Sequence, residues 1–404
     1  MLLTAEEQAI LAGSRGAAAR RALEYQVEVG RFWGAKRFVP VTNVHMMGDI
    51  EVMGDGGLAW LKEEAASGAR CRVATTTNAR CVDFVHCERL GQDQVEVGKE
   101  RELIATLRRM DVVTTDTCIN YQTVYQPHLG EHVAWGDTGT VIYANSVFGA
   151  RSNFESGPAA LAAAITGRTP EYGFHLDEHR RGTFAVRLDC SLEDLADWGA
   201  VGKIVGESHQ DYFAVPVFHG FRRTPTADEL KHLGAALASY GSMGMFHFEG
   251  VTPEAPSELP PEKMVVGQKE IEAVYAGYKL GDGDARLVVF SGPQQSLLEM
   301  KRLAELFQGR KVQGSCFVTT NAAVLAQSRD LGYAQAIEQA GATILQGVCF
   351  YILQNLSPMR ERNQWKNMVS NSAKIVNIIG AHRFNTILRR TADCVEIACT
   401  GKLK

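Results

Sequence analysis

The sequence predicts an α/β protein built mainly from doubly wound parallel sheets. Beyond residue 265, short apolar runs alternate with amphipathic helical runs over short connections. The first 250 residues show the same alternation. Three strand candidates end in a Thr-Thr pair, in "VATTTNA", "VVTTDTC" and "FVTTNAA", which suggests internally related, pseudo-duplicated βα units. Such units place polar segments at carboxyl strand ends, where open α/β sheets bind ligands.

The individual elements follow from this alternation. In the C-terminal region we expect strands at "RLVVF", "SCFVTT", "ATILQGVCFYIL" and "NTILRR", and helices at "SLLEMKRLAELF" and "NAAVLAQSRDLGYAQAIEQAG". In the N-terminal region we expect strands at "CRVATTT", "DVVTTDT" and "GTVIYANS", and helices at "KERELIATLRRM", "GPAALAAAITG" and "TADELKHLGAALASYG". Capping boxes at Thr4–Glu7 and Thr226–Glu229 indicate two helix starts.

A proline-rich segment suggests where the domains divide. Gly250–Gly267 contains four of the chain's 12 prolines together with several acidic residues. Such a composition is typical of a linker or a long surface loop. We therefore predict a boundary near residue 265, with an N-terminal α/β region over 1–265 and a C-terminal α/β domain over 266–404.

Composition limits the classes of partner. The chain has 404 residues, 45% hydrophobic and 22% charged, with a net charge of −4. This balance argues against nucleic acid or an anionic membrane as the main partner. The N-terminus lacks the pattern of a signal peptide, and no apolar run of about 18 residues occurs. The expected compartment is the cytoplasm, so the nine cysteines are expected to be free thiols or metal ligands.

The stretch from Trp135 to Gly182 is the richest in polar groups. A Gly-containing loop, "NSVFGARSNFESG", precedes an alanine-rich helix that is expected to begin after Gly157. A helix N-terminus favours anions, and Arg151 adds a guanidinium suited to a carboxylate or phosphate. The alternative is a tight solvated turn with a surface arginine. His175 and His179 have the spacing of a helical metal pair, but their charged, glycine-bracketed segment is more typical of a loop.

Three cysteines stand out from the other six. Cys118 follows an expected strand in a polar segment, and Cys349 lies close to Gly347. Cys394 follows Thr391, an expected N-cap, which would place this thiol in a first helical turn where its pKa is lowered. The spacings exclude the usual zinc patterns. The residues alone leave open whether these three cysteines meet.

The run from Trp135 to Arg181 resembles the hallmark of the aconitase X family, "YANSV-GARSN-E-GP-AL-AAI-GRTP-YG-HLDE". "GKIVG", "HFEGVTPEA" and "SNSAK" match the same family in order, so the resemblance spans nearly the whole chain. It implies aconitase-like catalytic domains, an iron–sulfur cluster and dehydratase activity. It also implies a small swivelling domain, either fused or as a separate subunit, which could supply the catalytic base.

The departures from the family pattern bear on the substrate. Archaeal members that act on mevalonate 5-phosphate carry cysteine pairs in three loops. In this chain the first loop keeps Cys118 and has Asp116 in place of the other cysteine, and the third loop keeps Cys349 and has Gln346. The second loop, "SGPQQS", has no cysteine. This pattern resembles that of the cis-3-hydroxy-L-proline dehydratases. The resemblance then leaves Cys118, Cys349 and Cys394 as cluster ligands, with Cys399 or Cys316 as alternatives for the third, and a [2Fe–2S] cluster is expected.

The implied reaction removes water from cis-3-hydroxy-L-proline to give Δ1-pyrroline-2-carboxylate. We assign the clamp for the substrate carboxylate to Arg151, Asn153 and the helix N-terminus at Gly157. Other substrate-binding candidates are Asn145, Ser146, Ser152, His175 and Asn371, and Lys203, Ser372 and Lys374 are catalytic candidates. Two alternatives remain: another hydroxy acid such as mevalonate 5-phosphate, or a cluster-binding subunit with no activity alone. A cysteine hydrolase built on Cys118 is disfavoured, because Asp116 would raise the pKa of the thiol.

Overall fold

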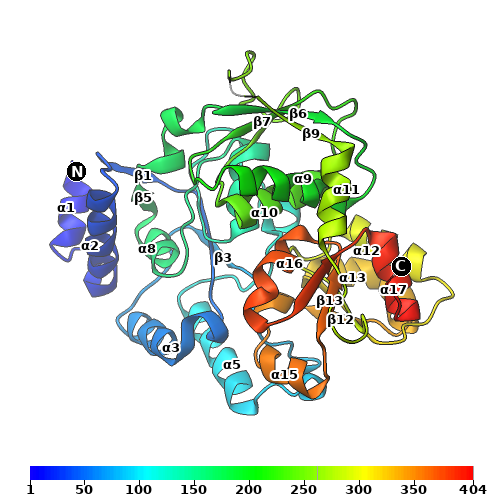
Figure 1. The fold of residues 1–404 in the computed structure, drawn as a ribbon. Helices are drawn as coiled ribbons and strands as arrows, with labels where there is room; N and C mark the ends of the chain where they lie inside the picture. The colour runs from blue at the N-terminus through cyan, green and yellow to red at the C-terminus, as the bar shows by residue number, and fades with distance from the viewer. Residues whose placement is uncertain (262, 404) are drawn as a thin grey trace.

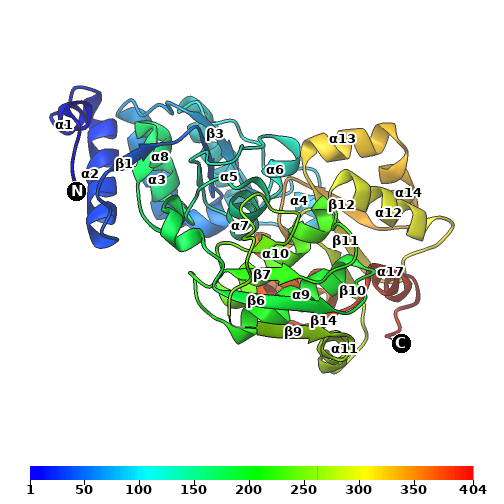
Figure 2. The same ribbon diagram turned by 90° about the horizontal axis from the view of Figure 1, so that it is seen from above.

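Three parallel sheets, each with its own helices, organise the computed structural model (Figures 1 and 2), which describes residues 1–261 and 263–403. We call them the N-terminal part (strands β1–β5), the middle part (β6–β9) and the C-terminal part (β10–β14). Glu262, in the proline-rich segment, and Lys404, at the end of the second predicted domain, lie outside the described residues. The α/β class and the mainly parallel sheets are confirmed. The pseudo-duplication is not, since the sheets differ in strand number and order.

The N-terminal part has a three-stranded parallel sheet of order β3-β2-β4. Alanine-rich α8 begins after Gly157, which has a positive φ of 53°, and ends at left-handed Gly167, as predicted. Its small side chains let α2 pack closely against it. The elements are α1 (Ala5–Leu11), α2 (Gly16–Phe32), β1 (Phe38–Pro40), β2 (Asn43–Met46), α3 (Ile50–Ala66), β3 (Ala74–Thr77), α4 (Cys87–Leu90), α5 (Gln94–Arg109), α6 (Asn120–Thr123), β4 (Ala134–Trp135), α7 (Thr138–Tyr143), α8 (Pro158–Thr166) and β5 (Arg168–Pro170).

The middle part has a four-stranded parallel sheet of order β8-β7-β6-β9. Helices α9 and α10 lie between this sheet and α16 of the C-terminal part (Figure 1). The elements are β6 (Phe184–Asp189), α9 (Leu195–Ser208), β7 (Pro216–His219), α10 (Ala227–Gly241), β8 (His247–Phe248), β9 (Lys263–Gly267) and α11 (Gln268–Gly277). Because β9 pairs with β6, the boundary predicted near residue 265 falls inside this sheet. The proline-rich segment therefore returns the chain to the edge of the same sheet.

The C-terminal part has a five-stranded parallel sheet of order β12-β11-β10-β13-β14. The chain winds outward from β10 in one direction and then from β13 in the other, so the two strands flank a topological switch point. The elements are β10 (Leu287–Phe290), α12 (Leu297–Phe307), β11 (Ser315–Thr320), α13 (Ala322–Asp330), α14 (Tyr333–Gln339), β12 (Thr343–Gln346), α15 (Leu356–Arg362), β13 (Asn367–Ser370), α16 (Ala373–Ile378), β14 (Asn385–Leu388) and α17 (Thr391–Thr400).

Two predicted strands are wrong. "GTVIYANS" forms α7 and then a π-helical turn, Ala144–Phe148, because Asp137 caps the helix through Gly139 N–H and burial on all sides removes the usual amphipathic pattern. "DVVTTDT" contributes a single bridge, Thr76–Val113, because Asp111 and Asp116 both have positive φ and bend the segment away from the sheet. The capping boxes at Thr4–Glu7 and Thr226–Glu229 are confirmed.

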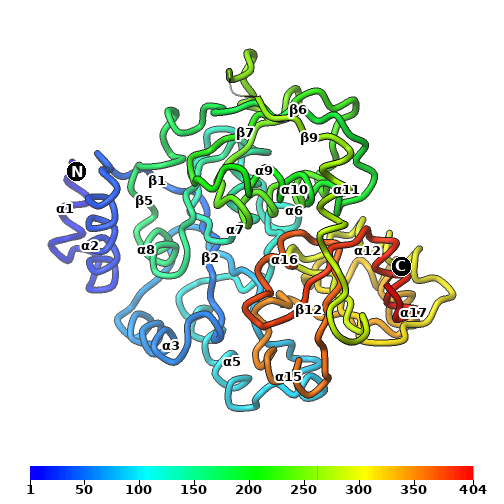
Figure 3. The backbone as a smooth tube through the Cα atoms, in the orientation of Figure 1, coloured from blue at the N-terminus to red at the C-terminus, as the bar shows by residue number. Residues whose placement is uncertain are grey.

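Close packing acts both within the parts and between them. Glycines let α9 and α10 approach until a Cβ at Gly202 would lie 2.6 Å from that of Ala236, so "GKIVG" has a packing role. Orange α15 lies against a cyan segment of the N-terminal part (Figure 3), where Arg362 donates to Leu90 O at 2.7 Å. Among the described helices, none is long and apolar enough to cross a bilayer.

Candidate active site

A cavity of about 340 Å³ opens where the three parts meet. A wider hollow of about 600 Å³ shares four of its lining residues, so the two form one continuous cleft. The shared residues are Met47, Val52, Asp137 and Thr138. The cavity is further lined by Asn78, Cys118, Ala238, Ser239, Gly292, Cys349, Tyr351, Ile352, Lys374 and Ile378.

The C-terminal sheet explains the position of this cavity. Gly292 follows β10, Lys374 follows β13, and Cys349 follows β12. The carboxyl ends of parallel strands meet at one edge of a sheet, and a switch point opens a crevice there. The N-terminal part covers this crevice with Cys118 and with Asn78, which follows β3.

Two thiols face the cavity from different parts of the chain. Cys118 is buried, and its sulfur accepts a hydrogen bond from Gln294 N–H at 3.2 Å. Burial, with Asp137 and Cys349 nearby, raises the pKa of Cys118 to about 12, although Lys374 and the Gln294 N–H act in the opposite direction. Burial also raises the pKa of Cys349, while Lys374 and the Tyr351 N–H lower it. The cationic neighbour and the N–H donors are what a thiolate ligand requires.

Lys374 and Asp137 form the charged pair of the cavity. Lys374 Nζ lies 3.6 Å from Asp137 Oδ2, and Asn78 Nδ2 donates to Asp137 Oδ1 at 3.2 Å. Burial alone would lower the pKa of Lys374, but Asp137 and the two thiols raise it above its ordinary value. The ammonium therefore stays charged and can hold an anionic group beside the thiols.

The N-terminus of α8 opens on the wider hollow. Ser156, Gly157 and Pro158 line it, together with Trp60 and Met53 of α3. Free N–H groups at a helix N-terminus favour an anion. The structure thus brings the predicted Gly157 to the cleft, and its role in substrate binding stays a prediction.

The other predicted substrate-binding residues in or near this loop do not line the cleft. They bond to main-chain groups of the loop and of neighbouring segments. Arg151 donates to His175 O at 2.8 Å and pairs with Asp177, and His175 pairs with His132 through their Nδ1 atoms at 2.8 Å. The remaining side chains bond to main-chain groups: Asn145 to Ser152 and Gly244, Ser146 to Phe246, Ser152 to Trp135, and Asn153 to Tyr172 and Phe174. The loop therefore acts as a scaffold between the N-terminal and middle parts.

His179 is also placed away from any metal site. Its ring stacks on Phe213, and short 3-10 turns replace the helix that the His175–His179 spacing would need. Burial and nearby cationic groups hold the pKa of His175 well below its ordinary value, so its ring is neutral.

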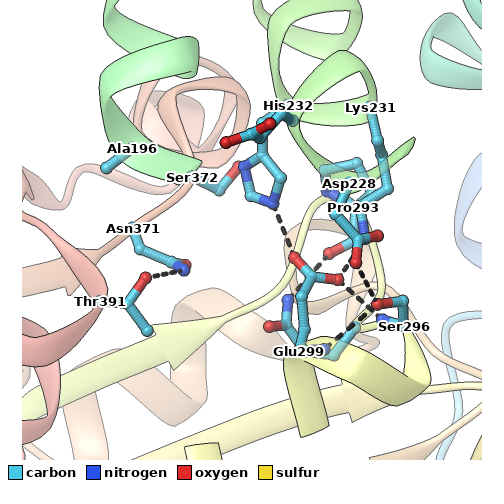
Figure 4. Close-up of polar contacts among 12 residues, drawn as sticks. Ala196, Asp228, Lys231, His232, Pro293, Ser296, Glu299, Asn371, Ser372 and Thr391 are labelled. Carbon is cyan, nitrogen blue, oxygen red and sulfur yellow. Dashed lines mark hydrogen bonds and ion pairs between the residues drawn. The ribbon is translucent and has the colours of Figure 1, made fainter. Parts of the chain in front are cut away.

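The remaining catalytic candidates separate into two groups. Lys203 pairs with Glu207 and lies 4.5 Å from the Tyr240 ring, outside the lining of the cavity. Ser372 caps α16 and donates to Gly292 O, while Asn371 donates to Thr391 Oγ1 at 3.1 Å (Figure 4). Ser372 and Asn371 thus support the two segments that carry Gly292 and Lys374, and only Lys374 lines the cavity.

Cys394 is not brought to the cavity. It is fully buried in the hydrophobic core of the C-terminal part, and this core also contains Cys316 and Cys399. Arg390, not Thr391, is the N-cap of α17, and burial raises the pKa of Cys394 well above its ordinary value. No group of three His, Cys, Asp or Glu side chains is placed to hold a metal ion within residues 1–261 and 263–403. Of the three cysteines predicted as ligands, the structure therefore brings Cys118 and Cys349 to one cavity and not Cys394, and the role of Cys118 and Cys349 as ligands stays a prediction.

Sequence reasoning missed Asp137, Asn78 and Gln294. Asp137 precedes Thr138 and Gly139, a pattern that indicates an N-cap, but the expected strand concealed it. Asn78 follows one of the Thr-Thr pairs at a strand end, the position that was expected to hold ligands. Gln294 lies in "SGPQQS", one of the three loops compared above, but the sequence does not show that its amide bonds to two loops far away in the chain.

Comparison with known proteins agrees with this architecture. The models of the aconitase X first, second and third domains match residues 1–178, 182–276 and 285–400. The chain belongs to the aconitase X family. It is a hydro-lyase of this family, since the characterised relatives are dehydratases.

Three relatives show the range of the family. The phosphomevalonate dehydratase large subunit of Methanothermobacter thermautotrophicus is 36% identical, over 86% of this chain and 87% of that protein. The cis-3-hydroxy-L-proline dehydratase of Pseudomonas aeruginosa is 31% identical, over 99% of this chain and 70% of that protein. The holo form of Thermococcus kodakaraensis aconitase X superposes with a TM-score of 0.89 at 32% identity, covering 98% of this chain and all of that one.

Proposed function

We propose that this aconitase X chain is the large subunit of a cis-3-hydroxy-L-proline dehydratase. The observation that carries the proposal is the charge of the cavity, which presents one cation, Lys374, and one anion, Asp137, beside two thiols. The reaction breaks the Cα–H bond and the C3–O bond and releases one water. The enamine that forms then tautomerises to Δ1-pyrroline-2-carboxylate.

The charge pair matches a zwitterion. The carboxylate of a hydroxyproline would bind Lys374 and the N-terminus of α8, and its ammonium would bind Asp137. A phosphorylated substrate brings a further dianion, which calls for arginines or several lysines. Lys374 is the one cationic side chain among the described residues that line the cavity and the wider hollow.

The thiol pair fits an iron–sulfur cluster. Cys118 and Cys349 would hold it, because both sulfurs face one cavity with N–H donors and an ammonium nearby. A bound cluster with an open iron position supplies a Lewis acid for the departing hydroxyl. We keep [2Fe–2S] as the proposed type, and the small subunit as a candidate source of further groups.

The residues of this chain would bind and orient the substrate. Lys374 would hold the carboxylate, which makes the adjacent Cα–H more acidic. Asp137, fixed by Asn78 and by the Gly139 N–H, would orient the ring nitrogen. We propose that the proton acceptor at Cα comes from a small swivelling subunit that closes over the cleft.

Phosphomevalonate is the second candidate substrate. It is favoured by the higher identity to enzymes of that name, which are themselves named large subunits. The same names support a separate small subunit here. The cytoplasm remains the proposed compartment, because all nine cysteines are free thiols and disulfides are rare there.

The test is an anaerobic co-purification with a candidate small subunit, followed by assays on both substrates and a count of iron and sulfide. We expect turnover of cis-3-hydroxy-L-proline, little turnover of mevalonate 5-phosphate, and little activity of the large chain alone. Turnover of mevalonate 5-phosphate alone would reverse the choice of substrate. An iron-free complex that dehydrates neither compound would contradict the proposed function.

A further inference from the structure

Gln294 connects the two loops that carry the cavity thiols. It is fully buried in the segment after β10. Its backbone N–H donates to Cys118 Sγ, and its side-chain Nε2 donates both to Asp116 O and to Val348 O, each at 3.2 Å. Asp116 lies two residues before Cys118, and Val348 lies directly before Cys349. One amide group therefore bridges a loop of the N-terminal part and a loop of the C-terminal part.

The segment of Gln294 is itself anchored from the other side. Lys231 of α10, 1% exposed, donates to Gln294 O at 3.3 Å. Lys231 Nζ also pairs with Glu299 and lies 3.2 Å from Asp228 Oδ1, while Glu299 contacts His232 Nε2 at 2.8 Å (Figure 4). This charged group holds the segment against the middle part, so all three parts fix the position of Gln294.

A second connection between the same loops comes from Arg80. Its guanidinium pairs with Asp116 and donates to Gln346 O at 2.8 Å. Arg80 therefore also links the two loops, through the Asp116 side chain in the first and through the Gln346 carbonyl, three residues before Cys349, in the second. Loss of the Gln294 amide leaves this connection intact, which favours a folded variant.

We infer that Gln294 is a positioning residue that sets the placement of Cys118 relative to Cys349. Gln294 is not among the residues that line the cavity, so it acts through the thiols and not on the substrate. The inference rests on the proposed function in taking the thiol pair as the cluster site. The placement of the two sulfurs can nevertheless be measured without any cluster.

The measurement uses phenylarsine oxide on the reduced, metal-free chain. This arsenic(III) reagent condenses with two neighbouring thiols: two S–H bonds break, two As–S bonds form, one water leaves, and arsenic keeps its oxidation state. Mass spectrometry of the digest identifies the bridge between the peptides of Cys118 and Cys349 and gives its rate of formation. In the wild-type chain we expect this bridge to form.

The variants test the side-chain amide of Gln294 separately from its backbone N–H. Gln294→Leu removes the side-chain donor and keeps the N–H to Cys118, and we expect capture to slow about tenfold, because the two loops lose both hydrogen bonds of the amide. Gln294→Asn, one methylene shorter, should be similarly slow, whereas Gln294→His should recover most of the rate because its ring N–H lies at nearly the same reach. The matched control is Gln295→Leu: among the residues that the structure describes, this neighbouring buried amide bonds to Pro293 O of its own segment alone, at 3.4 Å.

Iron content and visible absorption after reconstitution give a second readout. We expect Gln294→Leu to retain less iron and to lower kcat with little change in KM, and Gln295→Leu to match the wild type. Equal capture rates in the wild type, Gln294→Leu and Gln294→Asn would overturn the inference, as would a wild-type chain that forms no bridge. If Gln294→Leu does not fold, Gln294→Asn is compared with Gln294→His. Slower capture in Gln294→Asn than in Gln294→His supports the inference, and equal capture rates in these two variants overturn it. A wild-type chain that forms the bridge but binds no iron would contradict the proposed function and leave the role of Gln294 standing.

Discussion

The polar loop Asn145–Gly157 and the residues around the cavity contrast sharply. The loop is dense in polar side chains, yet these side chains bond to the backbone, and the loop reaches the cleft only at its end. The cavity is assembled from single residues in separate segments, such as Cys118 in a loop of the N-terminal part and Cys349 and Lys374 after strands β12 and β13. The polar groups of a conspicuous motif can thus be used in contacts within the fold, while the proposed chemistry lies at isolated positions.

The largest effect is expected at the thiols. Cys118→Ser or Cys349→Ser should remove the iron and lower activity about 1000-fold or more, which corresponds to roughly 4 kcal/mol. Cys394→Ser should keep the iron and the activity, because Cys394 lies in the hydrophobic core of the C-terminal part and not at the cavity. Iron analysis and the visible spectrum check this. Loss of iron in Cys394→Ser would break the contrast and restore the three-cysteine set.

Lys374 should come next. Lys374→Met removes the one ammonium of the cavity, so kcat/KM should fall by about 100- to 1000-fold, the range for losing one preorganised donor. The matched control is Lys203→Met, whose ammonium pairs with Glu207 outside the cavity and should change activity less than about twofold. Steady-state kinetics with the complete complex measure both. A large loss of kcat/KM in Lys203→Met would instead indicate that the active site includes the "GKIVG" motif.

Two buried carboxyls of the N-terminal part should make stability depend on pH. Burial raises the pKa of Asp49 to about 7 and, with Asp49 nearby, that of Glu100 to about 8. Both exceed the values of an unfolded chain, so this contribution to stability is complete below about pH 4 and is lost as pH rises through about 7–8. Glu100→Gln should therefore stabilise the chain at pH 8.5 by an amount on the order of 2–4 kcal/mol.

Denaturant unfolding at pH 4.5 and pH 8.5 tests this prediction. The difference between the variant and the wild type should be small at the lower pH and large at the higher one. An equal difference at both values would mean that Glu100 acts through packing and not through ionisation.

The smallest effect on activity is expected at Arg151. Its guanidinium bonds His175 O and Asp177, so Arg151→Lys should lower stability by about 1–2 kcal/mol and leave kcat/KM within about threefold. Thermal unfolding and steady-state kinetics, measured on one preparation, separate the effect on stability from the effect on kcat/KM. A loss of kcat/KM beyond tenfold with unchanged stability would return the polar loop to the active site.

Much of the fold followed from local signals. Strands such as Leu287–Phe290 and capped helices such as Ala227–Gly241 carry their own periodicity and end signals. Helix α7 was missed because its segment is buried on all sides and has no amphipathic period, and β-branched residues then suggest a strand. The proline-rich segment is predicted as a linker or a long surface loop with a boundary near residue 265, because the sequence shows no pairing partner for Lys263–Gly267.

The site was less accessible to sequence reasoning. Cys118, Cys349 and Lys374 could be named because strand ends and a family resemblance indicated them. Asp137 carried an N-cap signal that the expected strand concealed, and the contacts of Gln294 exist only in the tertiary structure. Arg151 is predicted from its guanidinium, and Cys394 from its place near a helix start. In the structure Arg151 bonds to His175 O and Cys394 is buried in a hydrophobic core, and the sequence shows neither contact.

The division of the cavity among three sheets has a consequence for biosynthesis. At 5–20 residues per second, the roughly 230 residues between Cys118 and Cys349 take on the order of 10–50 s to translate. During that interval the first thiol has left the ribosome and its partner does not exist. The proposed cluster site of Cys118 and Cys349 can therefore be completed only after most of the chain has been translated.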